Sequence, residues 1–160
     1  MYDFAPDSDL PKPERYRQLG EAAEALIAGE SDSVANMANV AALMWEFIPD
    51  LNWAGFYRVV GGELVLGPFV GRPACIRIPI GQGVCGTAAA TGETQLVEDV
   101  HAFPGHIACD ANSRSELVVP LKRDGHVVAV LDLDSPNPAR FDAEDASGIE
   151  RLAERLSASV

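Results

Sequence analysis

The sequence predicts a single α+β domain, in which helices pack on a largely antiparallel β-sheet. Apolar residues recur at helical spacing near both ends of the chain, whereas the middle holds two pairs of apolar runs joined by glycine turns. Consecutive hairpins give an antiparallel sheet, and the helices at the two ends must cover one face of it together. At 160 residues the chain is long enough for one sizeable core.

Residues 1–15 are predicted to form a poorly ordered N-terminal arm, because they combine acidic side chains with three prolines. The domain itself is expected to span residues 16–160. It opens with a helix over Tyr16–Ala28, a segment rich in helix-forming residues that Gly29 is placed to end.

A second helix is predicted in SDSVANMANVAALMWEFIPD, with Ser31 or Ser33 as its capping residue and Pro49 beyond its end. Its apolar residues recur at helical spacing. We expect three large ones to pack in the core or between helices: Met37, Met44 and Trp45.

The sheet begins with a hairpin in which NWAGFYRVV and ELVLGPFV are joined by Gly61-Gly62. CIRIPI, from Cys75 to Ile80, alternates with period two and is predicted to be a strand. In GQGVCGTAAATGE, glycines bound a run of small residues, which suits a tight turn into a short helix packed close to the sheet. TQLVEDV is predicted to be another short strand.

A second hairpin, SELVVPLKRDGHVVAVLDLDS, turns at Asp124-Gly125. The last helix is predicted to begin after Asp142, a capping residue that Asp145 follows at the spacing of a capping box. Helices and sheet then form a sandwich of two or three layers. The inward face of the last helix carries Ile149, Leu152 and Leu156.

The composition argues against two broad classes of partner. The net charge is −12 and the isoelectric point about 4.5, so no basic face is expected for nucleic acid or for a membrane surface. The chain has no apolar run of about eighteen residues, and its start lacks the basic and apolar regions of a secretory signal. We therefore expect a cytoplasmic protein, in which some acidic side chains could serve a cationic group on a small ligand.

The three cysteines are an odd number, so they cannot form a fully paired disulfide framework. A zinc site of three cysteines and one histidine is disfavoured, since no two cysteines have the close spacing of structural zinc knuckles, and we expect no bound metal. GQGVCG lacks the Gly-Lys-Ser/Thr ending of a phosphate-binding loop, so nucleotide binding is disfavoured too. The histidine of such a three-cysteine zinc site would be His101, His106 or His126.

Cys109 is the candidate nucleophile, because its loop holds proline, glycine, Asp110 and Asn112 and is expected to be accessible. Cys85 lies among glycine and alanine residues that are expected to pack tightly. Cys75 opens a predicted strand, from which it could face a neighbouring loop. From the residues alone, an inert thiol and a reactive one are equally open interpretations of Cys109.

Asp132 and Asp134 stand two apart in VAVLDLDSP and therefore face the same side of one strand. Glu116, on the partner strand of the hairpin, could add a third carboxylate. One interpretation is a solvent-exposed strand end. The other is that these groups bind a cationic group, or that one of them keeps its proton and acts as a general acid.

Several long segments resemble one family: NWAGFY, LGPFVGRPACIRIPIGQGVCGTAAATGETQLVEDVHAFPGHIACDANSRSELVVPL, and VLDLDSP with RFDAED. They are similar to the free methionine-(R)-sulfoxide reductases, which are built on a GAF domain. The resemblance runs from about Tyr16 to Leu156 and includes all three cysteines. It implies a GAF-like antiparallel β-sheet with helices packed on it.

The resemblance implies an L-methionine (R)-S-oxide reductase, an oxidoreductase that repairs free methionine (R)-sulfoxide under oxidative stress without a bound cofactor. Thioredoxin is the implied electron donor. By position, Cys109 matches the nucleophile that becomes a sulfenic acid, and Cys75 matches the main resolving thiol that closes a disulfide with it. Cys85 matches the third cysteine of the family.

The same resemblance implies a substrate pocket. Glu116, Asp132 and Asp134 match the carboxylates that hold the substrate and polarise its sulfoxide, and Trp53 and Tyr57 match its aromatic wall. A protonated carboxyl group there could give the sulfoxide oxygen its proton, while ionised ones could pair with the substrate ammonium.

Asp110 is expected to oppose thiolate formation at Cys109, and the candidate compensating cations by proximity are Arg114 and His106. Two alternative functions share the same fold: a non-catalytic GAF sensor of a small ligand, and a redox switch that uses the disulfide to change shape. A symmetric homodimer through the first two helices is a further interpretation.

Overall fold

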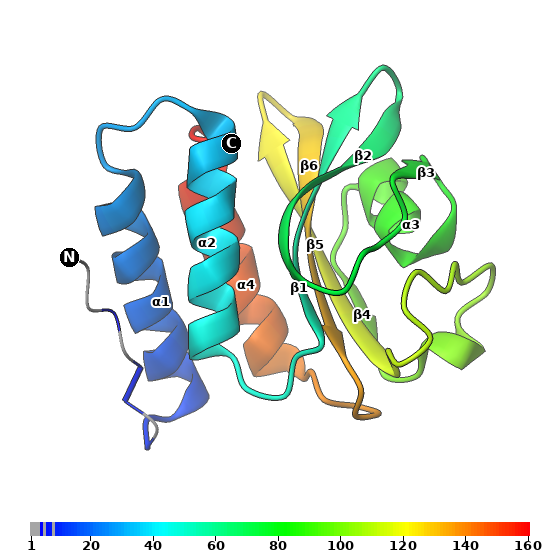
Figure 1. The fold of residues 1–160 in the computed structure, drawn as a ribbon, viewed down its shortest axis with the longest axis horizontal. Helices are drawn as coiled ribbons and strands as arrows, with labels where there is room; N and C mark the ends of the chain where they lie inside the picture. The colour runs from blue at the N-terminus through cyan, green and yellow to red at the C-terminus, as the bar shows by residue number, and fades with distance from the viewer. Residues whose placement is uncertain (1–3, 5, 8) are drawn as a thin grey trace.

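The computed structural model describes residues 4, 6–7 and 9–160 and has the predicted α+β architecture (Figure 1). One sheet of six antiparallel strands has the order β3-β2-β1-β6-β5-β4, and both predicted hairpins are confirmed. Among the described residues, no helix has the length and apolar character needed to cross a membrane. The strands span Trp53–Val60 (β1), Glu63–Gly71 (β2), Arg77–Pro79 (β3), Gln95–Val97 (β4), Ser115–Arg123 (β5) and His126–Ser135 (β6).

Three long helices lie on one side of the sheet and the short helix α3 lies on the other (Figure 1). Helices α2 and α4 pack directly on the strands, and α1 packs on these two helices from outside. The predicted cover of one face by the terminal helices is thus confirmed. The helices span Lys12–Ile27 (α1), Ser33–Phe47 (α2), Gly83–Thr91 (α3) and Ala143–Leu156 (α4), with a 3-10 turn at Val100–Ala102.

Side chains alternate between the two faces of the sheet, as the period of a strand requires. On β6, Leu131 and Leu133 belong to the larger apolar cluster under the long helices, together with the buried inward face of α4. Val130 belongs instead to a second, smaller cluster around α3. The larger cluster supplies most of the apolar burial, and the α3 face is left with room for polar groups.

Helix α1 begins earlier than the sequence predicted, at Lys12 rather than Tyr16. Pro13 is tolerated in the first helical turn, because the amide that it lacks would have no partner there. Four residues of the predicted arm are therefore helical. Residues 1–3, 5 and 8 of that arm lie outside the described residues.

Helix α2 is capped by Asp32 and not by Ser31 or Ser33. The Asp32 carboxylate accepts a hydrogen bond from the backbone amide of Ala35 at 2.9 Å, which satisfies one of the free amides of the first turn. Aspartate and serine are both good caps, so the local sequence alone could not choose between three adjacent candidates.

Two further predictions need correction. Trp45 is 38% exposed, whereas Met37 and Met44 are buried as expected, so only the two methionines belong to the core. The predicted strand over 75–80 is ordered as a strand only over Arg77–Pro79, and Cys75 lies in the loop before it. This short strand pairs only with the end of β2 that follows the hairpin turn, which limits its length.

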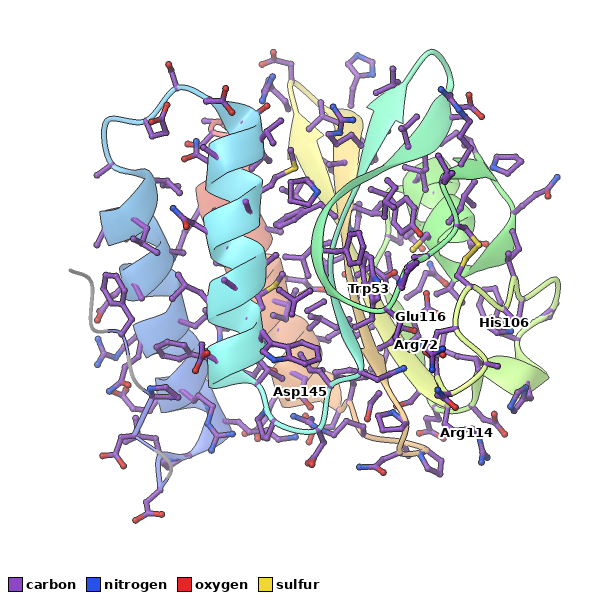
Figure 2. All side chains as sticks on the ribbon, in the orientation of Figure 1. Trp53, Arg72, His106, Arg114, Glu116 and Asp145 are labelled. Atoms are coloured by element: carbon purple, nitrogen blue, oxygen red, sulfur yellow. A yellow bond between two sulfur atoms is a disulfide. The ribbon has the colours of Figure 1, made fainter. Side chains whose placement is uncertain are left out.

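A buried carboxylate joins the first and last helices. Asp145 is 1% exposed, and it accepts hydrogen bonds from the Tyr16 hydroxyl at 2.7 Å, Lys12 Nζ at 2.8 Å and Arg140 Nη1 at 3.3 Å. Figure 2 places it on the helix side of the molecule. The two cations compensate its charge, so the network fixes α1 against α4 in addition to apolar packing.

We predict that Asp145→Ala lowers the free energy of unfolding by about 3–5 kcal/mol, because it leaves the buried Tyr16 hydroxyl and Arg140 Nη1 without their acceptor. The control variant Glu21→Ala breaks the exposed Arg17–Glu21 pair and should cost less than about 1 kcal/mol. Urea unfolding followed by circular dichroism measures both values. Equal losses in the two variants would contradict this account of the network.

Candidate active site

A pocket opens on the α3 face of the sheet, between β1, β5, β6, helix α3 and the loop that precedes β5. Cys75 is the one predicted site residue outside the lining, and it is bonded to Cys109, which belongs to the lining. Figure 2 shows Trp53 and Glu116 in this half of the molecule. The predicted site residues that line the pocket are Trp53, Tyr57, Cys85, Cys109, Glu116, Asp132 and Asp134.

The strand register brings the three predicted carboxylates together. Trp53 on β1 pairs with Asp134 on β6, which in turn pairs with Glu116 on β5. Two residues along β6, Asp132 pairs with Gly55 on β1 and faces the same side. Asp132 is only 5% exposed and Asp134 is half-buried, so the interpretation of the two aspartates as a solvent-exposed strand end is wrong for Asp132. Glu116 is likewise buried, at 6% exposed.

Two aromatic residues, Trp53 and Tyr57, form a wall of the pocket and also hydrogen-bond to the backbone of the segment that follows β2. The Trp53 ring stacks on those of Tyr57 and Phe69, with centroids 5.8 Å and 5.1 Å away. Its indole N–H donates to the carbonyl of Arg72 at 3.2 Å. The Tyr57 hydroxyl donates to the carbonyl of Cys75 at 3.0 Å. The wall therefore positions the segment that carries Cys75.

Cys75 and Cys109 form a disulfide, visible as a yellow bond in Figure 2, with their Cα atoms 5.3 Å apart. The loop that carries Cys109 is held by Asn52, the residue just before β1, because the Asn52 side-chain amide donates to Asp110 at 3.2 Å and to Ser113 at 3.1 Å. The pair implied by the family resemblance is thus present, and it joins two loops at the edge of the pocket.

Cys85 is the free cysteine and lies in the first turn of α3, only 4% exposed. Gly86 allows the helix this close approach, since a Cβ there would lie 2.5 Å from the Pro79 carbonyl oxygen. The Cys85 thiol donates a hydrogen bond to Glu116 Oε1 at 3.8 Å. The predicted tight packing of Cys85 is confirmed, and its sulfur faces carboxyl groups.

Burial dominates the ionisation of these groups. It raises the pKa of Asp132 to about 7, although a hydrogen bond from Cys85 acts in the opposite direction. The pKa values of Glu116 and Asp134 rise well above their usual range, because burial and the charge of Asp132 both disfavour ionisation. Burial also raises the pKa of the Cys85 thiol. Near neutral pH the cluster therefore holds protons that it can transfer.

The described residues that line the pocket include no lysine or arginine. His106 lines it, but burial and the nearby His101 lower the pKa of His106, so its ring carries little positive charge at neutral pH. Arg114 lies outside the lining and faces Asp99 at 3.9 Å, and Figure 2 shows it low in the view. Arg114 is therefore not brought to Cys109 as a compensating cation.

Sequence reasoning missed two residues that shape the site. Asn52 donates to the Cys109 loop, and Ser113 hydrogen-bonds to Asp134 in addition to Asn52. Both lie next to predicted features, since Asn52 opens NWAGFY and Ser113 lies just before β5. Their contacts join segments far apart in the chain, and no periodicity or spacing signals them. Asp110, expected to oppose a thiolate, is itself engaged by the amide of Asn52.

Comparisons with known proteins agree with this geometry. A profile of the GAF domain family matches residues 35–160. The free methionine-R-sulfoxide reductase of Escherichia coli K12 is 50% identical over 147 residues, which cover 92% of this chain and 89% of the relative. The similarity therefore extends over nearly the full length of both proteins.

Solved structures confirm the GAF-like fold. The X-ray structure of free methionine-R-sulfoxide reductase from Neisseria meningitidis, in complex with its substrate, has a TM-score of 0.93 at 47% identity. The superposition covers 98% of this chain and 94% of the Neisseria meningitidis chain. A GAF protein from Burkholderia vietnamiensis has a TM-score of 0.91 at 55% identity, with 94% of this chain and 96% of that one covered.

The raised pKa of Asp132 predicts how stability depends on pH. In the folded protein this pKa is about 7, against an ordinary value of 3.8, so between these values the folded state holds a proton that the unfolded state has released. This group therefore lowers stability as pH rises, and the loss is complete above pH 7.

We predict that Asp132→Asn, which cannot ionise, gains stability relative to the unchanged protein as pH rises from about 5 to about 8, by at most about 1.4 kcal/mol per pH unit. Urea unfolding of both disulfide-bonded proteins at the two pH values measures the difference. Asp124→Asn, at the exposed hairpin turn, is the matched control and should show no such gain. A constant difference between Asp132→Asn and the unchanged protein would contradict the pKa direction.

Proposed function

The chain belongs to the GAF domain family and is a close homologue of the free methionine-R-sulfoxide reductases, and we propose that it reduces free L-methionine (R)-sulfoxide to methionine. One observation carries the proposal. A single pocket joins a cysteine pair at its edge to three carboxyl groups, two of them buried and that of Asp134 half-buried, with no lysine or arginine among the described lining residues. A thiol can reduce a sulfoxide, and the carboxyl groups suit a cationic substrate.

Free methionine sulfoxide supplies the positive charge that the pocket lacks. Asp132 Oδ1 is buried without a hydrogen-bond partner among the described residues and is therefore available to the substrate ammonium. A methionine inside a protein chain has no such ammonium, so this contact selects the free amino acid. Trp53, only 2% exposed, offers an apolar surface to the methyl group on the sulfur.

Reduction starts from the thiols of Cys75 and Cys109. The Cys109 sulfur attacks the sulfoxide sulfur while Glu116 or Asp134 donates a proton to the sulfoxide oxygen. The oxygen, now a hydroxyl group, then moves to the Cys109 sulfur, as the substrate sulfur loses its bonds to oxygen and to the Cys109 sulfur. Methionine leaves, and Cys109 is left as a sulfenic acid. The Cys75 sulfur then attacks the sulfenic sulfur, water leaves, and a disulfide forms. The Cys75–Cys109 disulfide in the structure supports this pairing.

Thioredoxin is the proposed reductant of the disulfide. Cys75 and Cys109 are both partly exposed, and Ile76 beside them is 70% exposed. This side chain offers an apolar contact next to the bond that a reductant thiolate must attack. We place the protein in the cytoplasm, where thioredoxin keeps thiols reduced.

The domain predicted over residues 16–160 extends back to Lys12, where α1 begins, and we propose that it forms a homodimer through the first two helices. Val34 and Trp45 on α2 support the dimer, because they are 51% and 38% exposed and lie about three helical turns apart on one face. Large apolar residues together on an exposed helix face favour contact with another protein surface.

We predict that Cys109→Ser removes activity, whereas Cys75→Ser releases about one methionine per chain and then stops, because its sulfenic acid has no resolving thiol. Chromatography of methionine after mixing with the resolved (R) epimer measures the single turnover. Oxidation of NADPH, coupled through thioredoxin and its reductase, measures continued turnover. Full activity of Cys109→Ser, or no product from the unchanged protein with the (R) epimer, would contradict the proposed function.

A further inference from the structure

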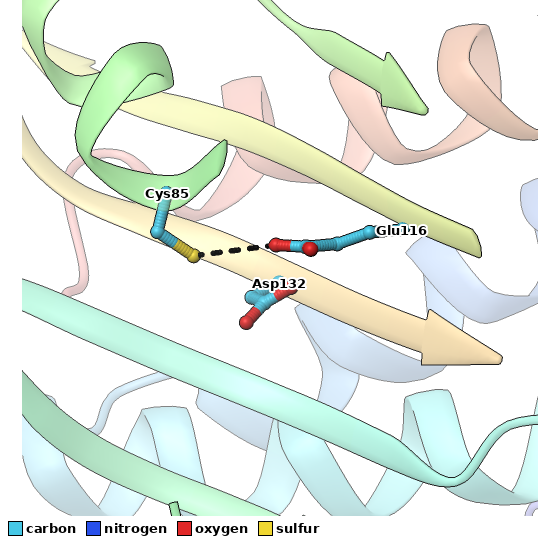
Figure 3. A group of neighbouring side chains, drawn as sticks. All are labelled: Cys85, Glu116 and Asp132. Carbon is cyan, nitrogen blue, oxygen red and sulfur yellow. Dashed lines mark hydrogen bonds between the residues drawn. The ribbon is translucent and has the colours of Figure 1, made fainter. Parts of the chain in front are cut away.

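Three side chains in the floor of the pocket converge on one point in Figure 3. Cys85 offers its sulfur from α3, and Glu116 and Asp132 offer carboxylate oxygens from β5 and β6. One ligand atom from each lies within 4.8 Å of the others. All three side chains line the pocket, so an ion that enters it can reach them.

The sulfur and one carboxylate oxygen are spaced close to the separation of two ligands around a tetrahedral metal ion. Bonds of about 2.3 Å to sulfur and 2.0 Å to oxygen place a thiolate and a carboxylate ligand about 3.5 Å apart around zinc. The Cys85 sulfur and Glu116 Oε1 are 3.8 Å apart, so a shift of a few tenths of an ångström brings them to that distance. Three protein ligands leave a fourth position for water.

A second observation points to a ligand at this place. Asp132 Oδ1 is buried and has no hydrogen-bond partner among the described residues. A buried carboxylate oxygen without a donor is costly, and a bound cation removes that cost. The described lining residues include no lysine or arginine that could do so instead.

We propose that Cys85, Glu116 and Asp132 form a binding site for a thiophilic divalent cation such as Zn²⁺. The metal–sulfur bond forms as the Cys85 thiol releases its proton to solvent. Glu116 and Asp132 likewise release the protons that they hold and bind the ion through carboxylate oxygens. A thiolate among the ligands selects zinc over magnesium or calcium, which prefer oxygen alone.

Cysteine spacing predicted no metal site, because a zinc site of three cysteines and one histidine requires closely spaced cysteines. The proposed site uses one cysteine with two carboxylates, and the strand register that joins them cannot be deduced from cysteine spacing. The two other cysteines are bonded to each other at the pocket edge and take no part.

The ion and the substrate ammonium would exclude each other, because both take Asp132 Oδ1 as a partner. This consequence rests on the proposed function, whereas the metal site itself does not. Zinc would then inhibit the enzyme by occupying the pocket rather than by blocking the thiols of Cys75 and Cys109.

The disulfide form of the protein gives the sharpest test, since Cys85 is then its free thiol. Titration with Zn²⁺ against a chromophoric chelator measures the dissociation constant. Titration with Co²⁺ reports the ligand directly, because a cobalt–thiolate bond adds a charge-transfer absorption in the near ultraviolet. We expect one Zn²⁺ or one Co²⁺ to bind per protein chain. The cobalt complex should show the thiolate absorption.

Ligand variants separate this site from surface binding. Cys85→Ser should lose the cobalt–thiolate absorption, and both it and Glu116→Gln should bind zinc at least about tenfold more weakly. Asp110→Asn, a carboxylate of the same pocket outside the three ligands, is the matched control and should keep the affinity. Thermal unfolding of each metal-free variant verifies that it is folded, and the two ligand variants test the site independently.

Free methionine, added as the product ligand, should raise the apparent dissociation constant of zinc. Unchanged zinc affinity in both Cys85→Ser and Glu116→Gln would overturn the site, and zinc binding without the thiolate absorption would overturn the role of Cys85. Failure of methionine to compete would overturn mutual exclusion alone. Failure of the metal-free enzyme to reduce the sulfoxide would overturn the proposed function and leave the zinc titration of the disulfide form as it stands.

Discussion

Three carboxyl groups on one buried face of the sheet, with no lysine or arginine among the described residues of their pocket, are the constraint on which the site depends. Glu116, Asp132 and Asp134 share that face because β5, β6 and β1 pair in a fixed register. A slip of one residue in β6 would turn both aspartates into the core under the long helices, where Leu131 and Leu133 lie. The apolar packing on the helix side therefore secures the polar arrangement on the other side.

Strand β1 links substrate contact to the redox pair. Its Trp53 and Tyr57 wall the pocket, and the Tyr57 hydroxyl holds the backbone of Cys75. Asn52, just before the strand, holds the loop that carries Cys109. The two cysteines thus belong to loops that are fixed from the same strand as the aromatic wall. A movement of this strand would displace binding and chemistry together.

The sequence predicts what depends on local pattern. Period-two alternation placed Asp132 and Asp134 on one face, glycine turns marked both hairpins, and the capping box at Asp142 marked the start of α4. It does not predict contacts between distant segments, because several pairings satisfy the same pattern. Two such contacts are the hydrogen bond from Asn52 to the Cys109 loop and the ion pair of Arg114 with Asp99. The role of Cys109 came from family resemblance, since loop context left an inert thiol equally open.

The most direct test of the central claim compares free methionine (R)-sulfoxide with 4-(methylsulfinyl)butanoate, which lacks the ammonium and adds no bulk. The measured quantity is kcat/KM for the two compounds, in the unchanged protein and in Asp132→Asn. We predict that loss of the ammonium costs at least about 30-fold in the unchanged protein and much less in the variant, because the charge pair is then already absent. Equal kcat/KM values for both compounds in the unchanged protein would contradict the account.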